Sequence, residues 1–155
     1  MSLSKEEALV KLRHYCAYQD RNHKEVRTKL LSIKVYGDLL EEIMSDLIDE
    51  DFLNEERYAK SFARGKFRMK SWGKIRIRRE LKFKGISDYS IKKAMQEVDE
   101  EGGYEETLLR LLEKYISART NKWPKNKLRN KAYEYAVQKG FESPLIIQSL
   151  NQIYY

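Results

Sequence analysis

The residue types that most often perform chemistry in proteins are few in this chain and stand far apart. Its two histidines, His14 and His23, are nine positions apart, and no cysteine or paired acid stands at ligand spacing to either. A metal site needs three or four converging ligands, so we expect two exposed helix histidines and no metal site. The single cysteine, Cys16, falls on the apolar side of a helical pattern and is expected to fill the core.

Catalysis and cofactor binding are not indicated either. The seven glycines are scattered and form no glycine-rich phosphate loop. Acids are plentiful, as in segments 41–42 and 49–51, but they suit the charge of helix ends and faces. No nucleophile has a base beside it. We therefore expect a protein that is not an enzyme, has no catalytic residues and binds no cofactor.

Positive charge is concentrated in the middle of the chain. Segment 64–84 holds ten basic residues against one acid and carries +9, which leaves −2 for the rest of a chain whose net charge is +7. A clustered basic surface releases counterions when it binds phosphates, and so gains affinity that evenly spread charge lacks. A solvated helix face is the other interpretation of this run. The expected contact residues are Arg64, Arg68, Lys70, Trp72, Lys74, Arg76, Arg78, Arg79 and Lys82.

Two tryptophans lie within basic stretches. Trp72 falls at a turn, where it would either stack on an unpaired base, contributing about 1–3 kcal/mol, or pack against the core or turn. Trp123 lies at the centre of a second, weaker basic stretch. The members of that stretch are Arg119, Lys122, Lys125, Lys127, Arg129 and Lys131.

The elements that must position these side chains are helices. Apolar residues over 39–48 recur at i, i+1, i+4, i+5, i+8 and i+9, which is one face of a helix and of no strand. Capping boxes begin helices at Ser4 and Asn22, Asn54 and Ser143 are further expected caps, and glycines end others. These signals divide the chain into about nine helices. The expected core of the middle part is Tyr58, Phe62, Ile77, Leu81, Ile86 and Ile91.

The chain repeats itself about every fifty residues. Segment 29–44 matches segment 80–95 at an offset of 51, and a third copy covers 133–150 at an offset of 55 from the second. In the first copy, Lys34 stands where Gly85 aligns. Repeats of this kind stack in a row. We predict an all-α, elongated array of three tandem three-helix repeats over 4–53, 54–102 (basic, central) and 103–155.

Targeting signals are not evident. The opening seven residues are polar, and no apolar run approaches the ~20 residues that span a bilayer. A single thiol forms no internal disulfide. We expect a cytoplasmic protein without membrane contact.

The stretch 49–87 resembles the central signature of the RecX family. The outer copies resemble that family's outer repeats more loosely, so the likeness covers nearly the whole chain. Departures are Lys34 and the turn at 120–125, which concern loop geometry. The matching elements are Phe52-Leu53-Asn54, Tyr58-Ala59, 62–68, Gly73 with Ile77, Glu80-Leu81 and Lys84-Gly85-Ile86.

The resemblance implies a curved row of three-helix units that binds the RecA recombinase and its filament on single-stranded DNA. It implies inhibition of RecA ATPase, recombinase activity and filament growth, within DNA repair, recombination and the SOS response. We expect a monomer, and direct DNA contact in addition. Two alternatives stay open: a stand-alone nucleic-acid-binding helical module, and a structural adaptor whose repeats grip another protein.

Overall fold

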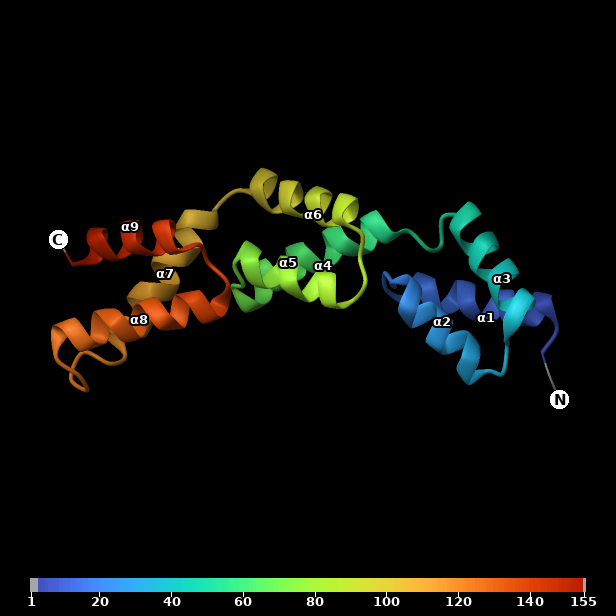
Figure 1. The fold of residues 1–155 in the computed structure, drawn as a ribbon, viewed down its shortest axis with the longest axis horizontal. Coiled ribbons are helices and arrows are strands. Elements are labelled where there is room, and N and C mark those ends of the chain that lie inside the picture. Colours follow the sequence, from blue (N-terminus) through green and yellow to red (C-terminus); the bar gives the residue numbers. More distant parts are fainter. Residues whose placement is uncertain (1–2, 155) are drawn as a thin grey trace.

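The computed structural model describes residues 3–154, which form nine helices and no strand (Figure 1). The predicted all-helical class is therefore confirmed. The helices are α1 (Lys5–Tyr18), α2 (His23–Ser32), α3 (Gly37–Asp49), α4 (Glu55–Lys70), α5 (Lys74–Phe83), α6 (Asp88–Glu101), α7 (Tyr104–Ser117), α8 (Lys125–Lys139) and α9 (Ser143–Ile153).

The buried apolar side chains form three clusters, one for each successive group of three helices. The groups lie in an elongated row with the two ends of the chain at opposite ends of the molecule (Figure 1). We call them repeats 1, 2 and 3. Tandem three-helix repeats are thus confirmed, while the boundaries 53/54 and 102/103 stay a prediction. Of the core residues expected in repeat 2, Phe62 is partly buried and the other five are buried.

Most helix starts follow the local signals. Both capping boxes form: the Ser4 hydroxyl accepts from the Glu7 amide at 3.2 Å, and the Asn22 side chain accepts from the Glu25 amide at 2.7 Å. The expected cap at Ser143 is wrong by one residue, because α9 begins at Ser143 itself. The Ser143 hydroxyl instead accepts a hydrogen bond from Tyr133 at 2.8 Å, so it caps no amide of α9.

Repeats 1 and 2 have the same kind of turn after their second helix, although only repeat 2 has a glycine there. Gly85 has a φ of +81°, and Lys34, which aligns with it, has a φ of +63°. A side chain in this left-handed region costs about 1–2 kcal/mol. The packing of repeat 1 around Val35, which is buried after the turn, holds the lysine in that conformation.

Candidate functional site

Two of the expected contact arginines form ion pairs within repeat 2. The Arg64 Nη1 atom lies 2.7 Å from the Glu97 carboxylate, and Arg68 pairs with Glu101. Both partners lie on α6, which runs parallel to α4, so the pairs join the two helices. The structure thus uses these arginines within the repeat, and it does not leave them as free positive charge.

Lys74 is also engaged within the protein. Its ammonium lies 2.7 Å from the Asp99 carboxylate and 4.0 Å from that of Glu142, and its amide donates to the Tyr104 hydroxyl at 2.9 Å. That hydroxyl in turn donates to Glu142. Burial raises the pKa of Tyr104 well above its ordinary value, and the bond to Glu142 raises it further. The hydroxyl therefore stays protonated and keeps donating.

Trp72 packs within the protein, where Arg76 lies over its ring. The guanidinium carbon of Arg76 is 4.1 Å from the ring centroid, and the Lys66 ammonium is 5.0 Å from it. Phe62 meets the ring edge-on, with centroids 6.4 Å apart. Arg76 also donates to the Gln138 carbonyl at 3.4 Å, in repeat 3. Arg76 already covers one face of the indole. Stacking of an unpaired base on Trp72 stays a prediction.

The remaining cations of α5 are exposed and close together. Arg78, Arg79 and Lys82 are exposed, and at this spacing they share one side of the helix. Lys82 faces Asp88 at 4.0 Å, and no acid lies within 4 Å of either arginine among the described residues. Lys92 of α6 lies across a groove of about 300 Å³ from Arg78 and Lys82. We call Arg78, Arg79, Lys82 and Lys92 the free basic face. Lys92 was missed because it lies outside the basic run of the sequence.

Lys70 lies apart from that face, at the end of α4 near repeat 3. Its side chain is exposed, and its carbonyl accepts a hydrogen bond from the Lys139 ammonium at 2.7 Å. Burial lowers the pKa of Lys139, and the charges of Arg76 and Lys70 lower it further. Positive charge is therefore crowded where repeats 2 and 3 meet.

The helix that carries the free basic face is fixed at its start by repeat 3. The amides of Gly73 and Ile75 donate to the carbonyls of Lys139 and Gly140 at 2.8 and 3.0 Å. The N-terminus of α5 thereby meets the C-terminus of α8. This arrangement gives partners to free amides of one helix end and free carbonyls of the other, and places the positive end of one helix dipole beside the negative end of the other. A Cβ on Gly73 would lie 2.3 Å from the Gly140 oxygen. The joint between repeats 2 and 3 therefore requires glycine.

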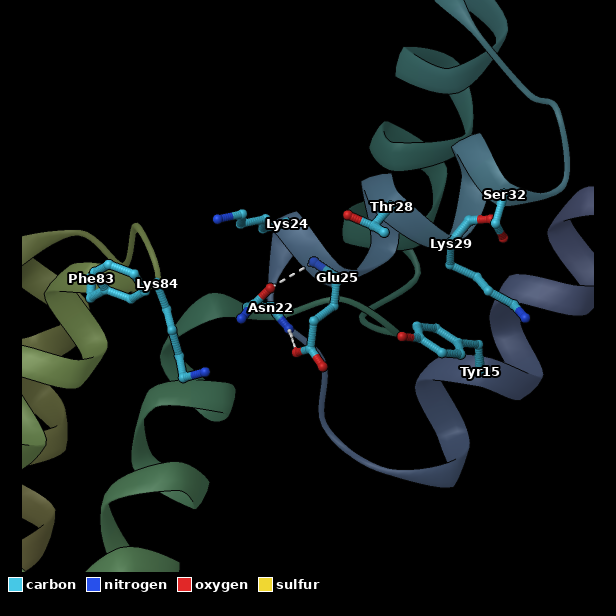
Figure 2. A pocket seen from close by; sticks show the side chains of 9 residues that line it. All are labelled: Tyr15, Asn22, Lys24, Glu25, Thr28, Lys29, Ser32, Phe83 and Lys84. Atoms are coloured by element: carbon cyan, nitrogen blue, oxygen red, sulfur yellow. Dashed lines mark hydrogen bonds between the residues drawn. The ribbon is translucent and has the colours of Figure 1, made fainter.

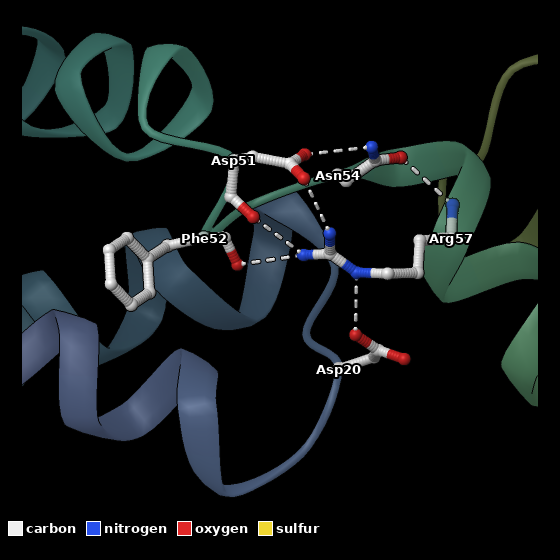
Figure 3. A network of polar contacts seen from close by, with 5 residues as sticks. All are labelled: Asp20, Asp51, Phe52, Asn54 and Arg57. Carbon is white, nitrogen blue, oxygen red and sulfur yellow. Dashed lines mark hydrogen bonds and ion pairs between the residues drawn. The ribbon is translucent and has the colours of Figure 1, made fainter.

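An arginine at the start of α4 links repeat 2 to repeat 1 (Figure 3). The Arg57 side chain contacts the carboxylates of Asp20 and Asp51 at 2.9 and 3.2 Å and the carbonyls of Asp51 and Phe52 at 3.0 and 3.3 Å. Asn54 caps α4 by accepting from the Arg57 amide at 2.9 Å, and its amide group donates to Asp51. Side chains, rather than paired helix ends, hold this joint.

A groove of about 440 Å³ lies beside that joint (Figure 2). Figure 2 shows Phe83, the last residue of α5, and Lys84, which follows it, across a gap from α2. The Glu25 carboxylate accepts a hydrogen bond from the backbone amide of Asn22. The groove is lined by Tyr15, Asn22, Lys24, Glu25, Thr28, Lys29, Ser32, Phe83 and Lys84.

Metal ligation finds no support among residues 3–154. No three histidine, cysteine, aspartate or glutamate side chains in that range come close enough together to hold a metal ion. Within the same range, no helix combines the length and apolarity that crossing a bilayer requires.

Repeat 2 corresponds to a known family domain. The model of "RecX, second three-helix domain" matches residues 54–95. That range runs from the cap of α4 to the buried Met95 of α6, and so includes the free basic face and the arginines, but not the glutamates, of both α4–α6 ion pairs.

Full-length relatives and solved structures agree with that match. Regulatory protein RecX of Streptococcus uberis is 30% identical over 133 residues, which are 86% of this chain and 50% of the relative. The protein of the same name from Finegoldia magna is 30% identical over 131 residues, 83% of this chain and 62% of the relative. The chain thus spans about half to three fifths of these relatives. The crystal structure of RecX from Lactobacillus salivarius superposes with a TM-score of 0.81 at 27% identity, covering 96% of this chain and 95% of that one. With the family's own domain in its middle repeat and the fold shared almost from end to end, the chain belongs to the RecX family.

Proposed function

We propose that this protein is a non-enzymatic regulator that binds RecA and RecA filaments on single-stranded DNA. Through that binding it inhibits RecA ATPase, recombinase activity and filament growth. It acts as a monomer in the cytoplasm, in DNA repair, recombination and the SOS response. Relatives that carry the name Regulatory protein RecX support the regulatory role.

The free basic face is the observation on which the docking proposal rests. Four cations from α5 and α6 lie together, with only Asp88 opposing them. Arginine presents a planar fork that matches both carboxylates and phosphates, so such a face suits acidic protein surface and exposed DNA backbone alike. The residues that we propose for docking are fewer than the basic residues of segment 64–84. Arg64, Arg68 and Lys74 hold the repeat together, and Lys70 lies at the margin.

The test is ATP hydrolysis by RecA on single-stranded DNA at low salt. The unmodified protein is expected to inhibit it. An Arg78→Glu/Arg79→Glu variant should require at least tenfold more protein for half inhibition, because a charge-assisted contact contributes about 1.5–3 kcal/mol. A Lys11→Glu/Lys34→Glu variant makes the same charge change on repeat 1 and should inhibit normally.

The design leaves Arg76 unchanged, because its contacts with Trp72 and repeat 3 would make its reversal a test of folding. Circular dichroism establishes that both variants are folded. No inhibition by the unmodified protein at saturating amounts would overturn the proposed function. Full inhibition by the Arg78→Glu/Arg79→Glu variant would exclude the free basic face from docking.

A stand-alone nucleic-acid-binding module is the second candidate. It is favoured by the cations beside aromatic rings in repeat 2, where Lys66 and Lys84 each lie 5.5 Å from the Phe62 centroid. Titration of labelled single strands without RecA separates the two functions. Tight, salt-dependent binding with no effect on RecA would favour the module.

A further inference from the structure

The tip of repeat 3 carries positive charge that acids of the described chain balance at only one lysine. Segment 114–133 contains seven basic residues and no acid. The basic run of repeat 2 is larger, but α6 supplies acids to four of its members. Around the tip, α9 contains no charged residue, and the single ion pair among the described residues joins Lys131 to Glu134 at 3.7 Å.

Trp123 lies between two of these cations. The Lys122 and Lys127 ammonium groups are 4.9 and 5.9 Å from the centroid of its ring. Both lysines are exposed, whereas Trp123 is half-buried against the core of repeat 3. The core thus holds the indole in place, with a lysine from the α7–α8 turn and one from α8 beside it.

A second aromatic ring lies beside two other cations, both from the beginning of α8. The Lys125 ammonium and the Arg129 guanidinium carbon are each 5.6 Å from the centroid of Tyr154. Arg129 donates to the neutral Asn151 side chain at 2.7 Å. The first turn of α8 contains no acid, and no side chain caps it. Free helix amides therefore add to the positive potential of the lysines.

Stability does not account for this arrangement. Like charges in the first turn of a helix oppose the helix dipole and one another, so they lower the stability of α8. Cations alternating with fixed aromatic rings are instead what proteins use to follow a single strand, whose phosphates meet the cations while its bases stack on the rings. Acidic peptides have no base to stack, and a duplex hides the faces of its bases.

We propose that the tip of repeat 3, formed by Lys122, Trp123, Lys125, Lys127 and Arg129, is a second binding site that takes single-stranded nucleic acid. The site is separate from the free basic face, since the α7–α8 turn lies at the C-terminal end of the row and α5 lies in its middle (Figure 1). Strand binding at the tip needs no RecA, so it goes beyond the proposed function and stands or falls separately from it.

Trp123 itself reports on the site. A Trp72→Phe variant leaves Trp123 as the only tryptophan, because the chain contains two. Adding oligothymidylate without RecA is expected to quench its fluorescence, with an affinity that falls as salt rises. Absence of quenching at low salt would overturn the proposal. So would equal quenching by polyphosphate of the same charge, since polyphosphate has no bases.

Charge reversal at the tip gives an independent measurement. Lys122→Glu/Lys125→Glu/Lys127→Glu should weaken oligonucleotide binding at least tenfold and reduce the salt slope by about 2, given a slope of roughly 0.7 per phosphate contact. Lys11→Glu/Lys24→Glu/Lys34→Glu makes the same charge change on repeat 1 and should bind almost normally. Equal affinity of the two variants would contradict the proposal. The tip variant is also assayed for RecA inhibition. If it inhibits RecA normally, the proposed function stands, whether or not oligonucleotide binding is weakened.

Discussion

Glu55 shows how one side chain joins two helices of repeat 2. Its carboxylate accepts hydrogen bonds from the hydroxyls of Ser87 and Ser90, at the N-terminal ends of α4 and α6. Burial by itself would raise the pKa of Glu55, but the two serine hydroxyls and the Ser87 amide outweigh it and lower the pKa below its ordinary value. A lowered pKa means that Glu55 stabilises the fold above its unfolded-state pKa, and that this contribution is lost as pH falls through the folded-state value.

Replacing Glu55 with Gln should therefore have an effect that depends on pH. At pH 7 we expect Glu55→Gln to lower the free energy of unfolding by about 1–2 kcal/mol, through loss of charge-assisted hydrogen bonds. Near pH 3 the difference from the unmodified protein should shrink, because Glu55 itself becomes protonated. Urea unfolding at the two pH values measures this, with the exposed Glu100→Gln as control. A difference that stayed constant with pH would contradict the assignment.

Helix ends, more than helix faces, join repeat 2 to repeat 3. The N-terminus of α5 donates to the carbonyls at the end of α8, and Gly73 and Gly140 allow their backbones to meet. Tyr104 adds an aromatic connection, with ring centroids 5.7 Å from Phe67 and 5.1 Å from Phe141. The helix that presents the free basic face is consequently held at one end by another repeat.

Two alanine substitutions at glycines should have opposite effects. Gly73→Ala places a Cβ 2.3 Å from the Gly140 oxygen, and we expect it to destabilise the protein by about 1–3 kcal/mol. Gly65→Ala lies inside α4 with no atom within 4 Å of the new Cβ, and should stabilise it by about 0.5–1 kcal/mol. Thermal unfolding compares the two. Unchanged stability in Gly73→Ala would mean that the close approach of the two glycines is unimportant.

The three repeats form a row whose two joints differ in kind. Backbone hydrogen bonds and stacked rings connect repeats 2 and 3, whereas the Arg57 side chain and its two aspartates hold repeat 1 against repeat 2. Ion pairs on a half-exposed arginine are weakened by salt, and backbone hydrogen bonds at buried glycines are not. Repeat 1 is therefore the part whose orientation responds to ionic strength.

Distances between spin labels test this difference. In a Cys16→Ala background, labels at positions 11 and 92 span repeats 1 and 2, and labels at positions 92 and 134 span repeats 2 and 3. Arg57→Gln, or high salt, is expected to broaden the first distance distribution and leave the second unchanged. Equal broadening of both pairs would show that the two joints are alike.

Local signals predicted the helices because they act over three or four residues. The capping boxes at Ser4 and Asn22, and the glycine stop at Gly85, operate through the neighbouring backbone and hold in the folded protein. Apolar periodicity identified the core of repeat 2 for the same reason. At Ser143 the hydroxyl accepts from Tyr133, ten residues away, a contact beyond the reach of such signals.

Which cations remain free depended on contacts far apart along the chain. Arg64 looks like Arg78 in the sequence, but Arg64 meets Glu97, 33 residues further on, and Arg78 meets no acid among the described residues. A residue's type gives the charge that it carries. Whether an acid pairs with that charge depends on which groups the fold brings within about 4 Å, and for Arg64 the acid comes from another helix.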